Sequence, residues 1–218
     1  MAIKPILFNS EMVRAILDGR KTCTRRICKD ANEYTVPDMD FYNADRRTYA
    51  VHNYADKEHT DKLSTAERTC PICPGDILYI RETWSPVFIR PRRYLYKVEC
   101  KEGENLPIKW HPSIHMPKEA ARIWLKVTDV RVERLQDITS EQISREGVEV
   151  EYPHVLNGEE KRYAFSTLWN STIKKSDIDR YGWSANPYVW VIEFERCEKS
   201  AESPYAWNDA IHKLTKGV

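Results

Sequence analysis

The segment Gly19-Arg20-Lys21-Thr22-Cys23-Thr24-Arg25-Arg26 gathers cationic, hydroxyl and thiol side chains in eight consecutive positions. Arginine offers a planar fork of donors that matches phosphate oxygens and base edges, so Arg20, Arg25 and Arg26 suit an anionic or nucleobase ligand. The run stands between a predicted helix and a predicted strand, where apolar alternation is expected, and this break with the local pattern indicates a functional site. The alternative is that these cations cap the carboxyl end of the helix.

A second set of polar candidates lies at the end of a predicted strand at 77–84. Arg81 and Glu82 could contact a polar ligand, or could form a salt bridge at the rim of the fold. Trp84 could stack on a nucleobase, as aromatic side chains do in proteins that bind single strands. Most of the seven tryptophans must nevertheless lie in the core.

Two pairs of potential zinc ligands also occur. Cys70 and Cys73 form a Cys-x-x-Cys pair, and His111 and His115 form a His-x-x-x-His pair. Residues 74 to 110 separate the pairs, far from the spacing of zinc fingers, so we expect no metal and no other cofactor, with a zinc site as the open alternative. The six cysteines are unevenly placed, which indicates reduced thiols rather than a disulfide framework.

The elements that must position these residues follow from periodicity. Ser10 to Asp18 has one apolar face and predicts a helix, with Ser10 as its N-cap and Gly19 closing it in the left-handed conformation. Thr139 and Gln142 fit a capping box of a second short helix that Gly147 can end. A third helix is predicted at 164–174, and strands are predicted at 77–84, 94–98, 122–134 and 188–196.

Strands outnumber helices, and helices interrupt them irregularly. This pattern favours an α+β fold built on a small mixed β-barrel of about five or six strands, with short helices at its margins. We expect a single domain over 1–218. It would include an insertion or long loop at 30–69, where aliphatic residues nearly vanish, and a terminal helix at 203–214. Deleting 30–69 should then leave a folded protein.

Charge and hydropathy limit the partners and the compartment. The chain has 34 basic and 33 acidic residues and a net charge of +1, so nucleic-acid binding would need a local basic patch. The first residues carry charges throughout and lack the apolar core of a secretory signal, and no apolar run is long enough to span a membrane. We therefore expect a cytoplasmic protein without a membrane partner.

Four landmarks of the chain resemble the ASCH superfamily, whose members have a PUA-like β-barrel. The segment from Ile16 to Arg26 resembles the opening signature of that family, and Pro74 to Leu78 resembles its Gly-Asp turn. Leu135 to Glu146 looks like the family's helix with a terminal Glu, and Val189 to Phe194 looks like its closing strand. The whole chain looks like ASCH proteins of phages and prophages, which implies the host cytoplasm as its location. The resemblance implies RNA or a modified nucleoside as the partner.

Small bacterial members with a similar motif hydrolyse N4-acetylcytidine with a Lys, a Thr and a Glu, which fall on Lys21, Thr24 and Glu146. Thr24 would be the nucleophile and Lys21 its base if neutral, whereas Glu146 would move a proton or, by favouring the ammonium, oppose that base role. In a regular strand, Lys21 and Thr24 point to opposite faces, so a shared site requires a turn or bulge at Thr22-Cys23. If the set is catalytic, Lys21→Ala and Glu146→Gln should each abolish turnover with nearly unchanged stability.

Three functions remain open on the sequence alone. The first is hydrolysis of the acetamide of a modified cytidine, and the second is RNA binding without chemistry. The third is RNA cleavage, since the same Lys, Arg and Glu could supply acid–base and charge stabilisation. A pocket of nucleobase size would favour the first, and an open basic groove would favour the second.

Overall fold

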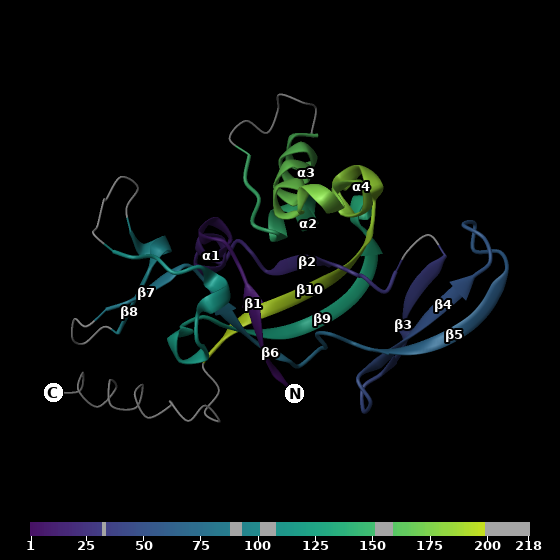
Figure 1. Ribbon diagram of the computed structural model, residues 1–218, viewed down its shortest axis with the longest axis horizontal. Coiled ribbons are helices and arrows are strands. Elements are labelled where there is room, and N and C mark those ends of the chain that lie inside the picture. Colours follow the sequence, from purple (N-terminus) through teal and green to yellow (C-terminus); the bar gives the residue numbers. More distant parts are fainter. Residues whose placement is uncertain (32–33, 88–92, 101–107, 151–158, 199–218) are drawn as a thin grey trace. The chain divides into compact units, whose positions relative to one another are not determined.

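The computed structural model describes residues 1–31, 34–87, 93–100, 108–150 and 159–198, and the helix expected at 203–214 lies outside them. Strands dominate and the helices are few and short, which confirms the α+β class (Figure 1). The strands are β1 (Ile3–Leu7), β2 (Cys23–Ile27), β3 (Thr35–Asn43), β4 (Thr48–Tyr54), β5 (Lys62–Thr69), β6 (Ile77–Arg81), β7 (Trp84–Pro86), β8 (Tyr94–Tyr96), β9 (Trp124–Arg134) and β10 (Tyr188–Cys197). The helices are α1 (Ser10–Leu17), α2 (Ser140–Arg145), α3 (Glu160–Thr172) and α4 (Ile178–Tyr181).

The strands form sheets of five, three and two strands, in the orders β1-β6-β9-β10-β2, β3-β4-β5 and β7-β8. Among the described residues no closed barrel is found, so the barrel stays a prediction. The chain divides into two compact units, the first comprising Met1–Leu17, Gly75–Lys126 and Glu195–Val218 and the second comprising Asp18–Pro74 and Val127–Phe194. Each unit combines segments that are distant in the chain, and the single domain over 1–218 also stays a prediction.

The first unit is built around β6. Strand β1 pairs with β6 in parallel, from Ile3 opposite Ile77 to Leu7 opposite Arg81, and the start of β9 pairs with β6 in antiparallel fashion. Helix α1 begins at Ser10, and its cap lies one residue earlier than expected, because Asn9 rather than Ser10 accepts the hydrogen bond from the Met12 amide, at 2.8 Å. The left-handed Gly19 after the helix is confirmed, with a φ of +77°.

In the second unit, β10 pairs with β2 in a regular antiparallel register from Val189 opposite Ile27 to Glu193 opposite Cys23. Helices α2, α3 and α4 lie on one side of these strands (Figure 1). The core between them is apolar and consists of Leu135, Ile138, Ile143, Phe165, Trp169, Val189 and Val191. The capping box of Thr139 and Gln142 is confirmed, and Gly147 follows α2 with a φ of +82°.

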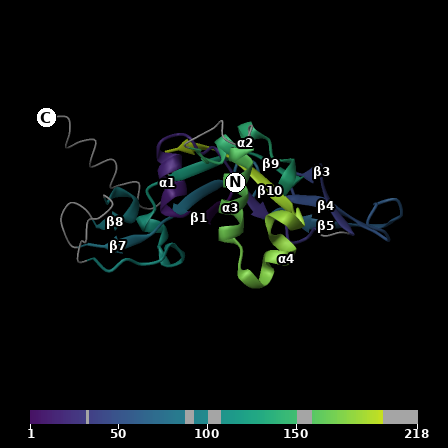
Figure 2. The ribbon, with the colours of Figure 1, turned by 90° about the horizontal axis from the view of Figure 1, so that it is seen from above.

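Of the two alternatives for the segment at 30–69, an insertion or a long loop, the loop is wrong and the insertion stays a prediction. The segment contains β3, β4 and β5, which lie side by side in an antiparallel sheet (Figure 2). Polar cross-strand contacts stabilise this sheet: His52 Nε2 lies 2.9 Å from Asp38 Oδ2, and His52 Nδ1 lies 3.0 Å from Thr65 Oγ1. The scarcity of aliphatic residues was misleading, because threonine, tyrosine and valine form strands well.

Candidate functional site

Lys21 and Glu146, which are 125 residues apart in the chain, meet in the second unit. Lys21 Nζ donates to Glu146 Oε2 at 2.6 Å and to the Glu146 carbonyl at 2.9 Å. The two residues also form a backbone bridge, and the Thr22 amide donates to the Arg145 carbonyl at 2.8 Å. Only 1% of the Lys21 side chain and 6% of the Glu146 side chain are exposed, so the pair joins the start of β2 to the end of α2 away from water.

Arg25 completes the buried group. Its guanidinium donates to Glu146 Oε1 at 3.2 Å, to Glu133 Oε2 at 3.2 Å and to Gln142 Oε1 at 3.1 Å. The Arg25 side chain is 1% exposed. One carboxylate, that of Glu146, is therefore shared by two buried cations, and both of them come from the segment that the sequence marked as too polar for its place.

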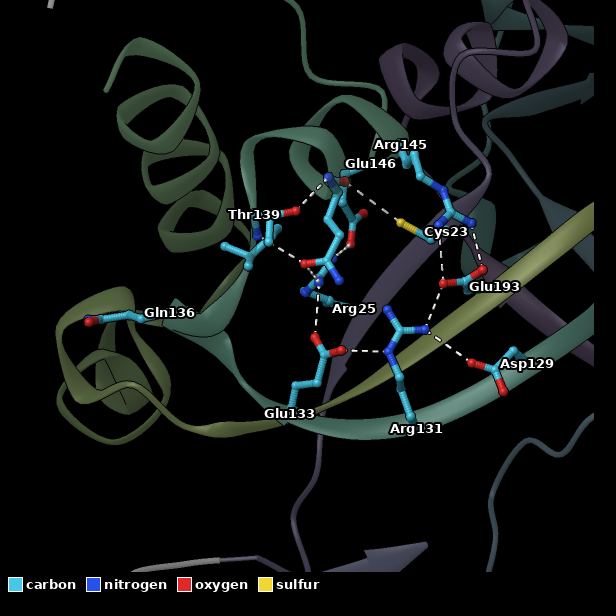
Figure 3. Close-up of polar contacts among 12 residues, drawn as sticks. Cys23, Arg25, Asp129, Arg131, Glu133, Gln136, Thr139, Arg145, Glu146 and Glu193 are labelled. Atoms are coloured by element: carbon cyan, nitrogen blue, oxygen red, sulfur yellow. Dashed lines mark hydrogen bonds and ion pairs between the residues drawn. The ribbon is translucent and has the colours of Figure 1, made fainter. Parts of the chain in front are cut away.

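Around this buried group, a more exposed layer of charges continues across β9, β10 and α2 (Figure 3). Arg131 donates to Glu133, Asp129 and Glu193. Arg145 donates to Glu193 Oε2 at 2.6 Å. The whole ion-pair cluster holds four cations and four carboxylates: Lys21, Arg25, Arg131, Arg145, Asp129, Glu133, Glu146 and Glu193. Its charge is balanced, so the cluster by itself is not a basic surface for RNA.

The protonation of three groups follows from this arrangement. Burial alone would raise the pKa of Glu193, but the hydrogen bonds from Arg145 and Arg131 outweigh it and lower that pKa. The same bond to Glu193 raises the pKa of Arg145. Burial, with Glu146 nearby, raises the pKa of the Cys23 thiol to about 12. Cys23 therefore stays a thiol at neutral pH. It is a poor nucleophile in this form, because the thiolate is the species that reacts.

Strand alternation separates Thr24 and Arg26 from the cluster. The register of β2 against β10 is regular from Cys23 to Ile27, so the bulge that a shared site requires is not found within this pairing. Cys23 and Arg25 contact α2, which places Thr24 and Arg26 on the other face of β2. Thr24 is buried there. The pKa of Arg26 is lowered by burial, and the attraction of Glu146 offsets only part of this effect.

Arg20 lies at the edge of an open groove. It donates to the Gly147 carbonyl at 3.2 Å and forms ion pairs with Asp18 at 3.0 Å and with Glu149 at 3.3 Å. The groove has a volume of about 960 Å³ and is also lined by Arg145 and Lys161. Three cations and two carboxylates line it, so the groove is only slightly basic.

The remaining candidates belong to the first unit and have partners of their own. Glu82 is 2% exposed and accepts two hydrogen bonds from Arg122, at 2.9 and 3.1 Å. Burial nevertheless raises the pKa of Glu82. Arg81 donates to the Ile114 carbonyl, and Trp84 is buried in an aromatic group with Tyr94 and His111. Glu82 thus forms a salt bridge and Trp84 lies in the core, as the structural alternatives have it, whereas Arg81 contacts a backbone carbonyl.

The cysteines are free thiols, and Cys70 and Cys73 are buried. Cys70 Sγ donates to the Ile72 carbonyl at 2.8 Å, and burial raises the Cys70 pKa to about 12. In the described part of the chain, no group of three or more His, Cys, Asp or Glu side chains is arranged to hold a metal ion.

The sequence did not single out Glu133, Arg131 and Glu193. A signal for them exists. Asp129, Arg131 and Glu133 alternate along one face of β9, and Glu193 interrupts the apolar run of β10. Charged residues at alternate positions of neighbouring strands predict a polar stripe across the sheet.

Comparisons of the chain with protein-family models, with curated proteins and with solved structures found no match. None of the helices in the described ranges is long and apolar enough to cross a membrane.

Proposed function

We propose that the chain is a PUA-like domain of the ASCH type that binds RNA or a modified nucleoside in the cytoplasm. The observation that carries the proposal is the buried contact of Lys21, Arg25 and Glu146. Lys21 and Glu146 are the two residues that the ASCH resemblance selects from distant parts of the chain, and they lie 2.6 Å apart. The barrel and the phage origin belong to this proposal.

Stability alone is a weak reason for such a cluster. Taking a lysine, an arginine and a glutamate out of water costs several kcal/mol per ion, and an apolar group of similar volume is often as stable. A buried set of this kind fixes the geometry around it. Here it ties β2 to α2 and so holds Arg20 at the groove and Arg26 on the opposite face of the strand.

Hydrolysis of an N4-acetyl amide is the second candidate, favoured by the contact of Lys21 with Glu146. Two features favour binding over this chemistry. Lys21 Nζ donates to two oxygens of Glu146 and is almost fully buried, so its present role is that of an anchor. Strand alternation also turns Thr24, the nucleophile of the transferred set, away from the face of Arg25.

The test is incubation of the full chain with N4-acetylcytidine and with a short single-stranded RNA. RNA binding is measured by fluorescence anisotropy over a range of salt concentrations, and products are measured by mass spectrometry. We expect RNA affinity that falls with salt, and a salt slope reduced by about one in Arg26→Ala, without cleavage. Release of cytidine would establish the enzyme instead, and the absence of both binding and product would refute the proposal.

A further inference from the structure

A hollow lies behind the ion-pair cluster, on the face of β2 and β10 that is turned away from α2. Its volume is about 260 Å³. The walls are mostly apolar, with Trp190 and Val130 from β10 and β9 and Ile72 from the turn between Cys70 and Cys73. Arg26 and Lys29 bring two cations to this lining. The hollow is slightly smaller than the pockets of drug-sized ligands, which measure about 300–1,000 Å³.

Neighbouring residues fix the walls in place. The Trp190 ring meets the Tyr49 ring edge-on, with centroids 5.0 Å apart and an angle of 89° between the planes. Tyr49 in turn donates its hydroxyl to Asp30, another lining residue, at 2.9 Å. The thiol of Cys70 donates to the Ile72 carbonyl. A ligand would therefore enter a hollow that is already formed, at a low cost in ordering.

The lining combines two kinds of chemistry. The apolar walls suit a flat ring, because a nucleobase buries its faces against aliphatic and aromatic side chains. The guanidinium of Arg26 and the ammonium of Lys29 suit an anion, and the fork of arginine matches phosphate oxygens in particular. Burial disfavours the charged form of Arg26, and a bound anion would offset that cost.

We propose that this hollow binds a nucleotide, with its base against Ile72, Val130 and Trp190 and its phosphate on Arg26 and Lys29. The inference rests on the proposed function and deepens it, because it places the ligand on the face of β2 opposite Lys21 and Glu146. The nucleotide is either free or part of an RNA strand, since both offer a base and a phosphate.

The experiment is titration calorimetry of the full chain with cytidine 5′-monophosphate, with cytidine and with a short single-stranded RNA. Three variants are compared. Ile72→Trp fills the hollow, Lys29→Ala removes an exposed cation of its lining, and Lys62→Ala removes an exposed cation of β5 that does not line it. The wild type should bind the monophosphate at least about tenfold more tightly than cytidine, because the phosphate adds charge-assisted hydrogen bonds.

Lys29→Ala should weaken binding of the monophosphate about fivefold and leave cytidine nearly unchanged. Ile72→Trp should abolish binding of both, and Lys62→Ala should match the wild type. Loss of RNA binding in Ile72→Trp would assign the hollow to a nucleotide of a strand. Retention of RNA binding would assign it to the free nucleotide.

The proposal is overturned if the wild type does not bind the monophosphate, or if Lys29→Ala and Ile72→Trp bind it like Lys62→Ala. These outcomes differ from failure of the proposed function, in which the wild type binds neither RNA nor any nucleoside. Thermal unfolding shows whether Ile72→Trp is folded. If it is not, Lys29→Ala decides the matter, because its side chain is exposed and its removal does not disturb the core.

Discussion

Lys21, Arg25 and Glu146 depend on one another more strongly than surface charges do. Their side chains are 1%, 1% and 6% exposed, so water screens little of their attraction and none can regain its hydration if a partner is lost. Removing one of the three side chains leaves its former partner as a charge in the interior with fewer ion pairs. Substitution of Lys21 or Glu146 should therefore lower the stability of the fold, contrary to the sequence-based expectation that stability is nearly unchanged.

We expect Glu146→Gln to lower the free energy of unfolding by about 3–5 kcal/mol, because it leaves two buried cations without their shared carboxylate. Urea denaturation measures this, with the midpoint and slope fitted separately. The control is Glu67→Gln, since the ion pair of Glu67 with Arg46 is 3.8 Å long and exposed and should contribute less than about 1 kcal/mol. Equal effects in the two variants would contradict the burial of Glu146.

A double-mutant cycle measures the interaction between Lys21 and Glu146 separately from their other contacts. Lys21→Met should destabilise the protein as well, because it leaves Glu146 with Arg25 alone. The double variant Lys21→Met/Glu146→Gln should lose less stability than the sum of the single losses, since residues in direct contact are coupled. Simple additivity would show that the 2.6 Å contact contributes nothing of its own.

Glu193 gives the cluster a dependence on pH. Its pKa is lowered in the folded state, so its contribution to stability is fully present above the unfolded value of about 4.3 and is lost as the pH falls through the folded value. Glu193→Gln lacks this contribution at every pH. The wild type should therefore be more stable than the variant at pH 7, and the difference should shrink below about pH 4. Denaturation series at several pH values measure it, and a constant difference would argue against the ion pairs with Arg131 and Arg145.

At the scale of elements, α2 organises the site although it spans only Ser140–Arg145. Gln142 has two roles in it. Its Oε1 accepts from the Thr139 amide at 2.9 Å, which completes the capping box, and also from Arg25 at 3.1 Å. The start of the helix and the buried arginine are thus held by one side-chain oxygen. Glu146 follows directly at the other end, where the left-handed Gly147 ends the helix.

Thr139→Ala should destabilise the protein by about 1 kcal/mol, because the backbone N–H of Gln142 loses the Thr139 hydroxyl as its acceptor. For a chain of this length that corresponds to a fall in Tm of about 2–4 °C in calorimetry. Thr139→Ser keeps the hydroxyl and should stay within about 0.5 kcal/mol of the wild type. If the serine variant loses as much as the alanine variant, the methyl group and not the cap stabilises this position.

The capping box and Gly19 were predictable because each depends on residues close together in the sequence. The N-cap of α1 was missed by one residue, since asparagine and serine are both good caps and stand side by side at positions 9 and 10. The contacts of Arg25 with Glu133 and Gln142 were not predicted. They join residues 108 and 117 positions apart. The pairing of β9, β10 and β2 brings Glu133 near Arg25, and the contact of α2 with β2 brings Gln142 there.

At the scale of the whole molecule, the segment at 30–69 was interpreted by composition, and composition does not reveal cross-strand pairing. Its sheet is held by polar pairs such as Asp38 with His52, which look like loop residues in a linear sequence. Among its described residues, Tyr49 is the largest fully buried side chain and packs against Trp190, and Val51 of the same strand is buried as well. A short run such as Tyr49-Ala50-Val51 within a polar segment is a weak signal in the sequence, but its aromatic ring buries a large apolar area.

Tyr49 changes the expected result of deleting this sheet. Replacing residues 35–69 by a short linker removes the ring that covers the edge of Trp190 and the hydroxyl that donates to Asp30. We expect the free energy of unfolding to fall by at least the amount lost in Tyr49→Ala, which is about 3–5 kcal/mol for a buried aromatic residue. Guanidinium denaturation of the wild type, the deletion and Tyr49→Ala measures both losses. Tyr54→Ala, a half-buried tyrosine of the same strand, is the matched control and should lose much less. A deletion variant as stable as the wild type would show that the sheet is an independent insertion and that the contact of Tyr49 with Trp190 contributes nothing to folding.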